Sequence, residues 1–319
     1  MSARVLGPAV VIVAGLALVP WFVRRDDVLN FLFLVLLFIT LAQSWNVIAG
    51  YAGQVNLGHA AFFGLGALVT RTLWIAGTPV LLGMLAGAAV AVGFALIIGW
   101  AAFRLRGAYF AIGTLALAEI CRITVGNVLA EISTLPQTTI AAYRLAHRYW
   151  LALALAALSV MAVALLAGSR LGLGMQAVRE DEDAAAATGV GALRLKLIAL
   201  VLSTALAGLA GGAFAYYHIS FYPSHLFSPQ WTFDAVLMTF IGGVGTLYGP
   251  ILGAIFYVFF KEYLAIRWVD FHLLIFGALF VAIVLLLPGG LVEGMRKLRG
   301  LAEAAALIPD RRRPRPEHR

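Results

Sequence analysis

Long apolar segments decide what this chain can fold into. Several of them reach the ~20 residues that a helix rising ~1.5 Å per residue needs to cross ~30 Å of hydrocarbon. Barrel strands are shorter and alternate in hydropathy. Only 12% of the residues are charged, against about a quarter in a soluble domain. The sequence therefore predicts an all-α, polytopic membrane helix bundle.

Ten apolar segments can be drawn, and we expect about ten membrane segments (eight to ten), with interrupted or re-entrant helices among them. The first follows Arg4 but precedes no A-x-A cleavage pattern, so we interpret it as an uncleaved helix. The eighth has only 13 residues, too few to cross upright, and is predicted to be a half-helix or a re-entrant piece. The segments are residues 5–23, 28–48, 54–75, 80–102, 108–128, 149–167, 195–218, 231–243, 249–264 and 271–287.

The distribution of basic residues predicts the orientation. Placing both termini in the cytoplasm puts 15 of the 23 lysines and arginines on the cytoplasmic side, as the positive-inside rule prefers. Residues 1–300 are predicted to form one transmembrane domain, followed by a basic cytoplasmic tail at 301–319. The tail ends in "RRRPRPEHR", whose two prolines oppose a helix. We interpret its five arginines as a solvated segment near anionic lipid, not as a nucleic-acid site.

The stretch "GYAGQVNLGHAAFFGLGAL", residues 50–68, interrupts the apolar pattern with five glycines and the polar side chains of Gln54, Asn56 and His59. Irregular backbone at membrane depth needs protein or a wet cavity to satisfy its amides. For Gln54 and Asn56 two interpretations stay open: a role in a pore or a helix cap, and structural hydrogen bonds between helices. For His59 a packing role is favoured, because no second histidine or carboxylate lies at metal spacing.

A second interruption follows segment 231–243, where "GGVGTLYGPILGA" begins. Paired interrupted segments point to a transport site. Glycines also let helices pack closely, as in the spacing of Gly83 with Gly87 and of Gly249 with Gly253. For the glycines alone we favour packing. The predicted substrate-path candidates are Gln54, Asn56, His59 and Asp234.

Sequence motifs for enzymatic chemistry are missing. None of the three lysines is followed by Ser or Thr, so the chain carries no P-loop, and H-E-x-x-H and G-x-S-x-G are missing as well. We expect no catalytic residue, no metal and no cofactor. The lone cysteine, Cys121, rules out an internal disulfide. Glu119 and Arg122 would share a helix face, and we favour a mutually neutralising pair over a proton relay.

The longest predicted cytoplasmic loop, residues 168–194, has the composition of a short helix lying along the membrane. Arg179 precedes four acids at 180–183, and four alanines follow before Gly189. Negative charge favours a helix N-terminus, and alanine has the highest helix propensity. A metal-binding cluster is disfavoured, because acids adjacent in sequence diverge around a helix. A charged helix between membrane spans offers a contact for a cytosolic partner.

This loop carries a family resemblance. "GMQAVREDEDAAAATGVGALRLKLIALVLSTALAGLAGGAF", residues 174–214, resembles the cytoplasmic coupling region of ABC importer permeases, specifically the M-type permease subunit of branched-chain amino acid transporters. Four further blocks resemble that family: residues 50–68, "RLRGAYFAIGTLALAEI" at 104–120, the block at 242–254 and "LLPGGL" at 286–291. Where such proteins carry a glycine-rich segment, residues 130–144 read "AEISTLPQTTIAAYR", which leaves the substrate open.

The resemblance implies a permease subunit, in a bacterial inner membrane, of an ATP-driven importer for branched-chain amino acids or a related small polar solute. The implied partners are a homologous second permease, two cytosolic ATP-binding subunits and a periplasmic solute-binding protein. Free backbone amides and carbonyls of the interrupted helices are expected to meet a zwitterion. The alternative is a stand-alone secondary carrier or channel; the scarcity of intramembrane charge argues against the carrier. The expected ATPase-coupling residues are Arg179, Glu180, Asp181, Glu182, Asp183 and Gly189.

Overall fold

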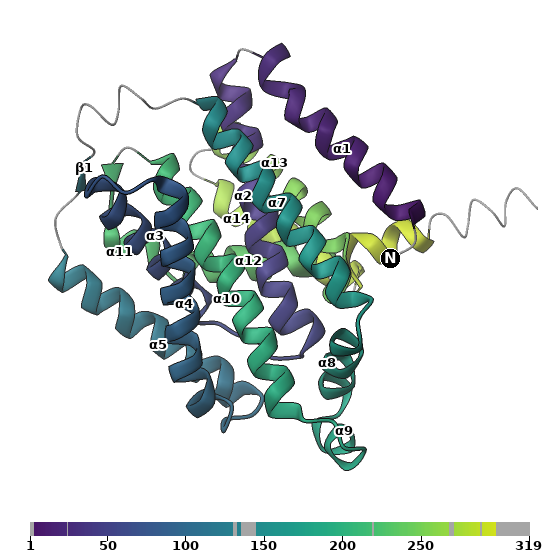
Figure 1. Ribbon diagram of the computed structural model, residues 1–319. Coiled ribbons are helices and arrows are strands. Elements are labelled where there is room, and N and C mark those ends of the chain that lie inside the picture. Colours follow the sequence, from purple (N-terminus) through teal and green to yellow (C-terminus); the bar gives the residue numbers. More distant parts are fainter. Residues whose placement is uncertain are drawn as a thin grey trace, which may run out of the picture.

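The chain folds into a bundle of α-helices (Figure 1). The computed structural model describes residues 3–23, 25–129, 133–134, 145–218, 220–267, 271–287 and 289–297. The first helices are α1 (Ala3–Phe22), α2 (Asp26–Trp45), the π-helix η1 (Asn46–Tyr51), α3 (His59–Ile75), α4 (Val80–Ala102) and α5 (Ala108–Val128). The next are α7 (Leu145–Ala167), α8 (Arg170–Glu180), α9 (Glu182–Ala187) and α10 (Ala192–Tyr217). The last are α11 (Pro223–Leu226), α12 (Gln230–Gly242), α13 (Gly249–Arg267), α14 (His272–Leu286) and a helical stretch at 290–297.

The predicted all-α membrane bundle is confirmed. The described strands are two-residue pieces, β1 (Ser133–Thr134) and β2 (Ser220–Phe221), which pair antiparallel. Five of the described helices are long and apolar enough to cross a bilayer by length and composition, and α2 reaches this length by continuing through η1 to Tyr51. Since α3, α12 and α14 have 17, 13 and 15 residues, the number of crossings stays a prediction. The tail at 301–319 and the segment at 130–144, apart from β1, lie outside the described residues.

One predicted boundary is wrong in an informative way. Segment 54–75 was expected to be helical from its start, but α3 begins only at His59. Gly53 adopts φ +70°, a left-handed conformation that favours glycine. The Asn56 side chain then accepts a hydrogen bond from the backbone N–H of Gly58 at 2.8 Å, which offers the backbone an alternative to a helix. The interruption therefore lies between η1 and α3.

Helix α10 runs through the middle of the bundle and packs against α2, α3 and α4 (Figure 1). Glycines let these helices approach closely, because a Cβ added to Gly211 of α10 would meet the Phe63 carbonyl of α3. Similarly, Gly87 of α4 lies against Gly66 of α3, and Gly253 of α13 lies against a carbonyl of α12. These contacts are typical of helices that associate in a membrane, and they support the packing interpretation of the glycines.

The short segment predicted around 231–243 is confirmed as α12, which ends where Gly243 adopts φ +127°. Helix α13 returns alongside it. Asp234 of α12 is only 5% exposed and accepts hydrogen bonds from the Tyr257 hydroxyl and, at 3.3 Å, from the Lys261 ammonium, both on α13. The carboxylate thus joins the two arms of this helical hairpin.

Helices α8 and α9 lie together at one end of the bundle, called here the α8–α9 end (Figure 1). The connection between α4 and α5 reaches the same end, where the Arg106 guanidinium lies 3.3 Å from the Asp183 carboxylate of α9. Helix α10 begins at this end and finishes at the opposite end, near α11. The α8–α9 end therefore gathers basic residues that were predicted to be cytoplasmic, namely Arg104, Arg106, Arg170, Arg179, Arg194 and Lys196.

Candidate functional site

The two interrupted stretches of the chain meet at the α8–α9 end. Asn46 in η1 is fully buried and bonds the loop 243–248 twice: its Nδ2 donates to the Thr246 carbonyl at 2.9 Å, and its Oδ1 accepts from the Gly245 amide at 2.8 Å. One helical turn earlier, Gln43 Nε2 donates to the Leu247 carbonyl at 2.8 Å. One helix end and one loop, about 200 residues apart in sequence, are therefore held together by side-chain amides.

Arg179 connects α8 to this contact. Its guanidinium donates a hydrogen bond to the Gly50 carbonyl of η1, and its aliphatic stem packs against Gly53. Gly245 lies against the same guanidinium, since a Cβ there would overlap Nη1. We call Arg179, η1 and the loop 243–248 the junction. The predicted coupling residue Arg179 thus turns its charged group toward the bundle, with 38% of its side chain accessible.

The four acids next to Arg179 have separate structural roles. Asp181 caps the N-terminus of α9 by accepting from the amides of Asp183 and Ala184 at 2.9 Å. Glu182 forms an ion pair with Lys196 of α10, whose side chain is only 2% exposed. Asp183, with a 78% exposed side chain, pairs with Arg106 at the surface, and Glu180 is 81% exposed.

Gly189 follows α9 directly. Its φ of +88° and the hydrogen bond from its amide to the Ala186 carbonyl at 3.0 Å end that helix. Among the expected coupling residues, Glu180 has an 81% exposed side chain, and its carboxylate lies 3.9 Å from Nε of the neighbouring Arg179.

Asn56 and His59 are buried among neighbouring helices. Both are fully buried, and His59 Nε2 lies 2.7 Å from the Ser44 hydroxyl of α2. The Asn56 carbonyl accepts from the Trp45 indole N–H at 2.9 Å. Within the described part of the chain, Asn56 Nδ2 and His59 Nδ1 are buried without a hydrogen-bond partner. The Asn56 side chain accepts from the Gly58 amide just before α3, as a helix cap would, and the substrate-path roles of Asn56 and His59 stay predictions.

The amides at the start of α3 already have acceptors. Leu57 N donates to the Thr114 hydroxyl at 3.1 Å, Gly58 N to Asn56 Oδ1, and Ala60 N to the Thr232 hydroxyl at 2.8 Å. The first amides of a helix have no partner within it, so the Thr232 hydroxyl acts as a cap for Ala60 of α3, and the other two bonds fix the backbone just before the helix. These three backbone groups, expected to be free for a substrate, are occupied in this structure.

The cap formed by Thr232 can be tested by substitution. We expect Thr232→Val to lower the free energy of unfolding by about 1–3 kcal/mol, because the buried Ala60 amide loses its acceptor. The measurement is the midpoint of thermal unfolding of the purified protein. Thr239→Val on the same helix is the matched control, because the Thr239 hydroxyl only donates, to Ala235 O at 2.8 Å and to Ala42 O at 3.3 Å. Equal shifts for the two variants would contradict the capping role.

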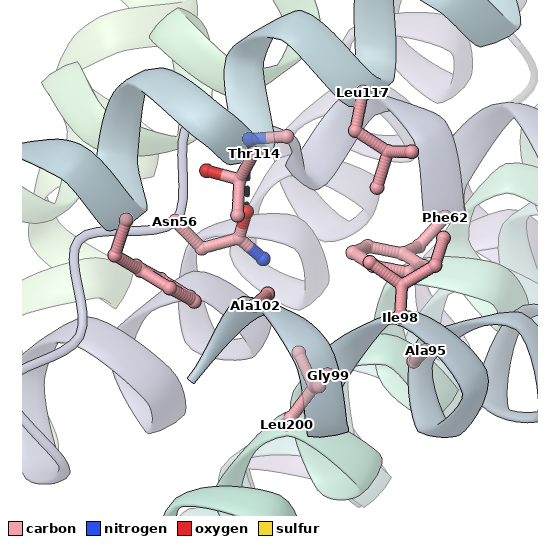
Figure 2. A pocket seen from close by; sticks show the side chains of 11 residues that line it. Asn56, Phe62, Ala95, Ile98, Gly99, Ala102, Thr114, Leu117 and Leu200 are labelled. Carbon is pink, nitrogen blue, oxygen red and sulfur yellow. Dashed lines mark hydrogen bonds between the residues drawn. The ribbon is translucent and has the colours of Figure 1, made fainter. Parts of the chain in front are cut away.

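A small cavity adjoins the interrupted stretch between α3, α4, α5 and α10. The Asn56 side chain points into it, and its other walls are mostly apolar, including Phe62, Ile98, Phe110 and Leu117 (Figure 2). Its volume is about 10 Å³. This is room for about one water molecule and not for an amino acid. In this structure the cavity is therefore not a substrate site.

The remaining path candidates lie apart from each other. Gln54 is partly exposed, and its Nε2 donates to the Ala52 carbonyl at 3.2 Å. Asp234 belongs to the α12–α13 hairpin described above. Asn56 and His59 are both buried beside α2, where they bond Trp45 and Ser44. Within the described residues, no group of three His, Cys, Asp or Glu side chains could hold a metal ion.

Two buried arginines at the opposite end were not singled out by the sequence analysis. Arg71 of α3 donates to the His218 carbonyl at 3.1 Å, and Arg148 of α7 donates to the Tyr217 carbonyl at 3.0 Å. Both carbonyls lie at the C-terminus of α10, where the helix dipole is negative. The available signal was a charged residue within an apolar segment for Arg71, in 54–75, and directly before one for Arg148, ahead of 149–167.

The polar residues of segment 28–48 were also overlooked. Gln43, Ser44 and Asn46 are fully buried at the end of α2 and in η1, and all three bond the interrupted stretches. In the sequence, they form a run of amide and hydroxyl side chains at the end of an apolar segment, just before a glycine-rich break. This pattern could have identified them as buried polar contacts.

Comparisons with known proteins agree on one family. Residues 28–284 match the family described as "Branched-chain amino acid transport system / permease component". The chain is 29% identical over 322 residues to the high-affinity branched-chain amino acid transport system permease protein LivM of Escherichia coli (strain K12), with 90% of this chain and 75% of that protein covered. It is 24% identical over 315 residues to the probable branched-chain amino acid transport permease protein LivM of Methanocaldococcus jannaschii, with 80% of this chain and 90% of that protein covered. No solved structure matches significantly.

Proposed function

The chain belongs to the family of permease components of branched-chain amino acid transport systems, and we propose that it is the membrane permease subunit of an ATP-driven importer. Its substrate is a branched-chain amino acid or a related small polar solute. The subunit transports and does not catalyse, and ATP is hydrolysed by two separate cytosolic subunits. A homologous second permease and a periplasmic solute-binding protein complete the assembly.

The junction is the observation that carries this proposal. Helices α8 and α9 expose a surface that includes Leu173, at 63%, and Glu180, while Arg179 on the same helix bonds the break after α2. One short element thus has an outer surface for a partner and an inner contact with both interrupted stretches. A secondary carrier has no need for this connection between an exposed helix and the membrane segments.

The junction suggests how the energy of ATP reaches the membrane part. An ATP-binding subunit that moves α8 displaces the Arg179 guanidinium, which is bonded to η1. Because Asn46 joins η1 to the loop 243–248, the same displacement moves the end of α12. Both interrupted stretches then shift together. We assign Arg179 the transmitting role and Glu180 a contact with the ATP-binding subunit.

The orientation follows from the same end of the bundle. With α8 and α9 in the cytoplasm, the basic residues gathered at the α8–α9 end lie on the cytoplasmic side of a bacterial inner membrane, in agreement with the positive-inside rule. From the distribution of basic residues we propose that both termini lie in the cytoplasm as well. The opposite end, with Arg71, Arg148 and α11, lies toward the solute-binding protein.

The substrate contacts form in a different conformation of the transport cycle from the one that this structure shows. The amides at the start of α3 are capped by side chains, and Asn56 and His59 are buried. A shift of η1 and of loop 243–248 can expose backbone groups to a zwitterion, which needs no fixed counter-charge. Gln54 is the path candidate with an accessible side chain in this structure. Selectivity then rests mainly with the solute-binding protein.

The contact assigned to Glu180 gives a specific expectation. We expect Glu180→Lys to weaken binding of the ATP-binding subunit by about 1 kcal/mol, or roughly fivefold in affinity, because the side chain is exposed and its interactions are screened. The measurement is the binding constant of that subunit at two salt concentrations. Glu180→Gln is the matched control for loss of charge alone. If the Lys variant and the native protein bound the ATP-binding subunit with equal affinity, Glu180 would not lie in the contact.

The assembly itself is tested by purification from native membranes through a tag on this chain. We expect the second permease and the ATP-binding subunits to co-purify in fixed proportion, and ATP hydrolysis to rise on addition of the solute-binding protein and leucine. A chain that purifies alone from mild detergent would favour the stand-alone carrier.

A further inference from the structure

Helix α5 exposes charge at the depth of the membrane. The Arg122 guanidinium binds the Glu119 carboxylate, with Nε 2.9 Å from both carboxylate oxygens. This confirms the predicted mutual pair. Yet the side chains of Arg122 and Glu119 remain 39% and 37% exposed on the single chain. Glu119 lies eleven residues after the start of α5 and Arg122 six residues before its end, so neither can reach a helix terminus easily.

The pair lies on a largely exposed helix. Helix α5 is the least buried of the five long apolar helices, with 22% of its apolar window buried. Ile112 and Ile123, at 63% and 52% exposed, share a helix face with Glu119, seven residues before it and four after it, and Ile120, at 61% exposed, borders that face. Figure 1 shows α5 at the edge of the bundle. We call these residues, with Glu119, Arg122 and Ala116, the α5 face.

Helix α4 shows what a lipid-facing surface of this chain looks like. It too has a largely exposed side, with Leu81, Leu85 and Ile97 at 63%, 61% and 76%. Its sequence from Val80 to Ala102 contains no charged residue. Ionisable side chains within membrane segments almost always face protein or a water-filled cavity, because hydrocarbon offers no hydrogen bonds. The contrast between the two helices indicates that lipid covers the exposed side of α4. The exposed side of α5 is instead covered by a surface that carries hydrogen-bonding groups.

We propose that the α5 face packs against the second permease subunit, with the Glu119–Arg122 pair at the centre of the contact. This inference rests on the proposed function, which supplies a homologous membrane subunit as the occupant. Within the described residues, the bonds of Arg122 engage Nε and Nη2. Its Nη1 group is available to donate to an acceptor on the partner, while the isoleucines supply the apolar rim.

Spin labels on matched alanines test the contact. Ala116 of the α5 face and Ala89 of α4 are both exposed residues near the middle of a long apolar helix. Each is replaced by cysteine in a background with Cys121→Ala and cysteine-free partners, and labelled with a nitroxide. Collisions with oxygen, which concentrates in lipid, are measured for the chain alone and for the purified assembly in nanodiscs.

We expect the label at position 116 to lose its collisions with oxygen on assembly and the label at position 89 to keep them. Unchanged collisions at 116 in an assembly that contains the second permease overturn the contact and leave the proposed function intact. A gain of collisions with a water-soluble nickel complex at 116 would place the face in the aqueous path and overturn the contact as well. An assembly without a second permease overturns both proposals.

Discussion

Arg179→Met is expected to abolish most ATP-driven uptake while the assembly still forms and hydrolyses ATP. Methionine keeps an apolar stem against Gly53 but removes the donor to the Gly50 carbonyl. A hydrogen bond from a charged group contributes about 1.5–3 kcal/mol, which corresponds to roughly a tenfold to hundredfold change in the equilibrium between coupled and uncoupled arrangements. The measurement is the number of substrate molecules taken up for each ATP hydrolysed in proteoliposomes.

Two variants make this result specific. Arg170→Met removes an exposed arginine from the first turn of the same helix and should leave the ratio unchanged. Arg179→Lys keeps the charge but not the planar guanidinium, so an intermediate ratio is expected. Loss of ATP hydrolysis together with uptake in Arg179→Met would mean that Arg179 contacts the ATP-binding subunit directly, and the transmitting role would be wrong.

Glu182→Leu is expected to have the largest effect on stability, lowering the free energy of unfolding by about 3 kcal/mol. The reason is that Lys196, almost completely buried, would lose its carboxylate partner. Breaking a buried pair by removing one partner costs about 3–5 kcal/mol, and we take the lower end because Glu182 is itself 27% exposed. The measurement is the thermal unfolding midpoint of the purified protein.

The same pair provides its own controls. Glu182→Leu combined with Lys196→Met should recover most of the lost stability, because no buried charge remains. Asp183→Asn removes the neighbouring acid, whose pair with Arg106 is 66–78% exposed, and should cost about 1 kcal/mol or less. If Glu182→Leu and Asp183→Asn destabilised equally, Lys196 would not depend on Glu182 for its burial.

Much of the bundle could be predicted from the length of apolar segments. Segments 80–102 and 108–128 coincide with α4 and α5, because each helix is a single apolar run and its boundaries are a local property of the sequence. The start of α3 could not be predicted in this way. It depends on the Thr232 hydroxyl, 172 residues away, and on a hydrogen bond within the break itself.

The candidate site was predicted in its parts but not in its connections. The short helices at 168–194 and the glycine break before 249 follow from local composition. The bond from Arg179 to Gly50 spans 129 residues, and those of Asn46 to loop 243–248 span 200 and 199, so no local pattern reveals them. Likewise, the four acids at 180–183 look equivalent in sequence, and only the positions of Lys196 and Arg106 separate their roles.

The interruption of the membrane segment at residues 50–68 has a structural explanation. The break lets η1 end against the loop 243–248 and lets α8 reach the Gly50 carbonyl, which a continuous helix would have used for its own hydrogen bonds. The π-helical geometry of η1 is consistent with this role, because such segments are frequent at functional sites. We infer that the break serves first to transmit movement from α8 to the membrane helices. Contact with the substrate is its second role.

Uptake of labelled leucine into proteoliposomes separates the importer from a carrier. The complete assembly, with the second permease, the ATP-binding subunits and the solute-binding protein, is compared with this chain alone under an imposed proton or sodium gradient. We predict concentrative uptake by the assembly only when ATP is supplied, and none by the single chain under either gradient. Concentrative uptake of leucine by the chain alone would contradict the importer and establish it as a secondary carrier.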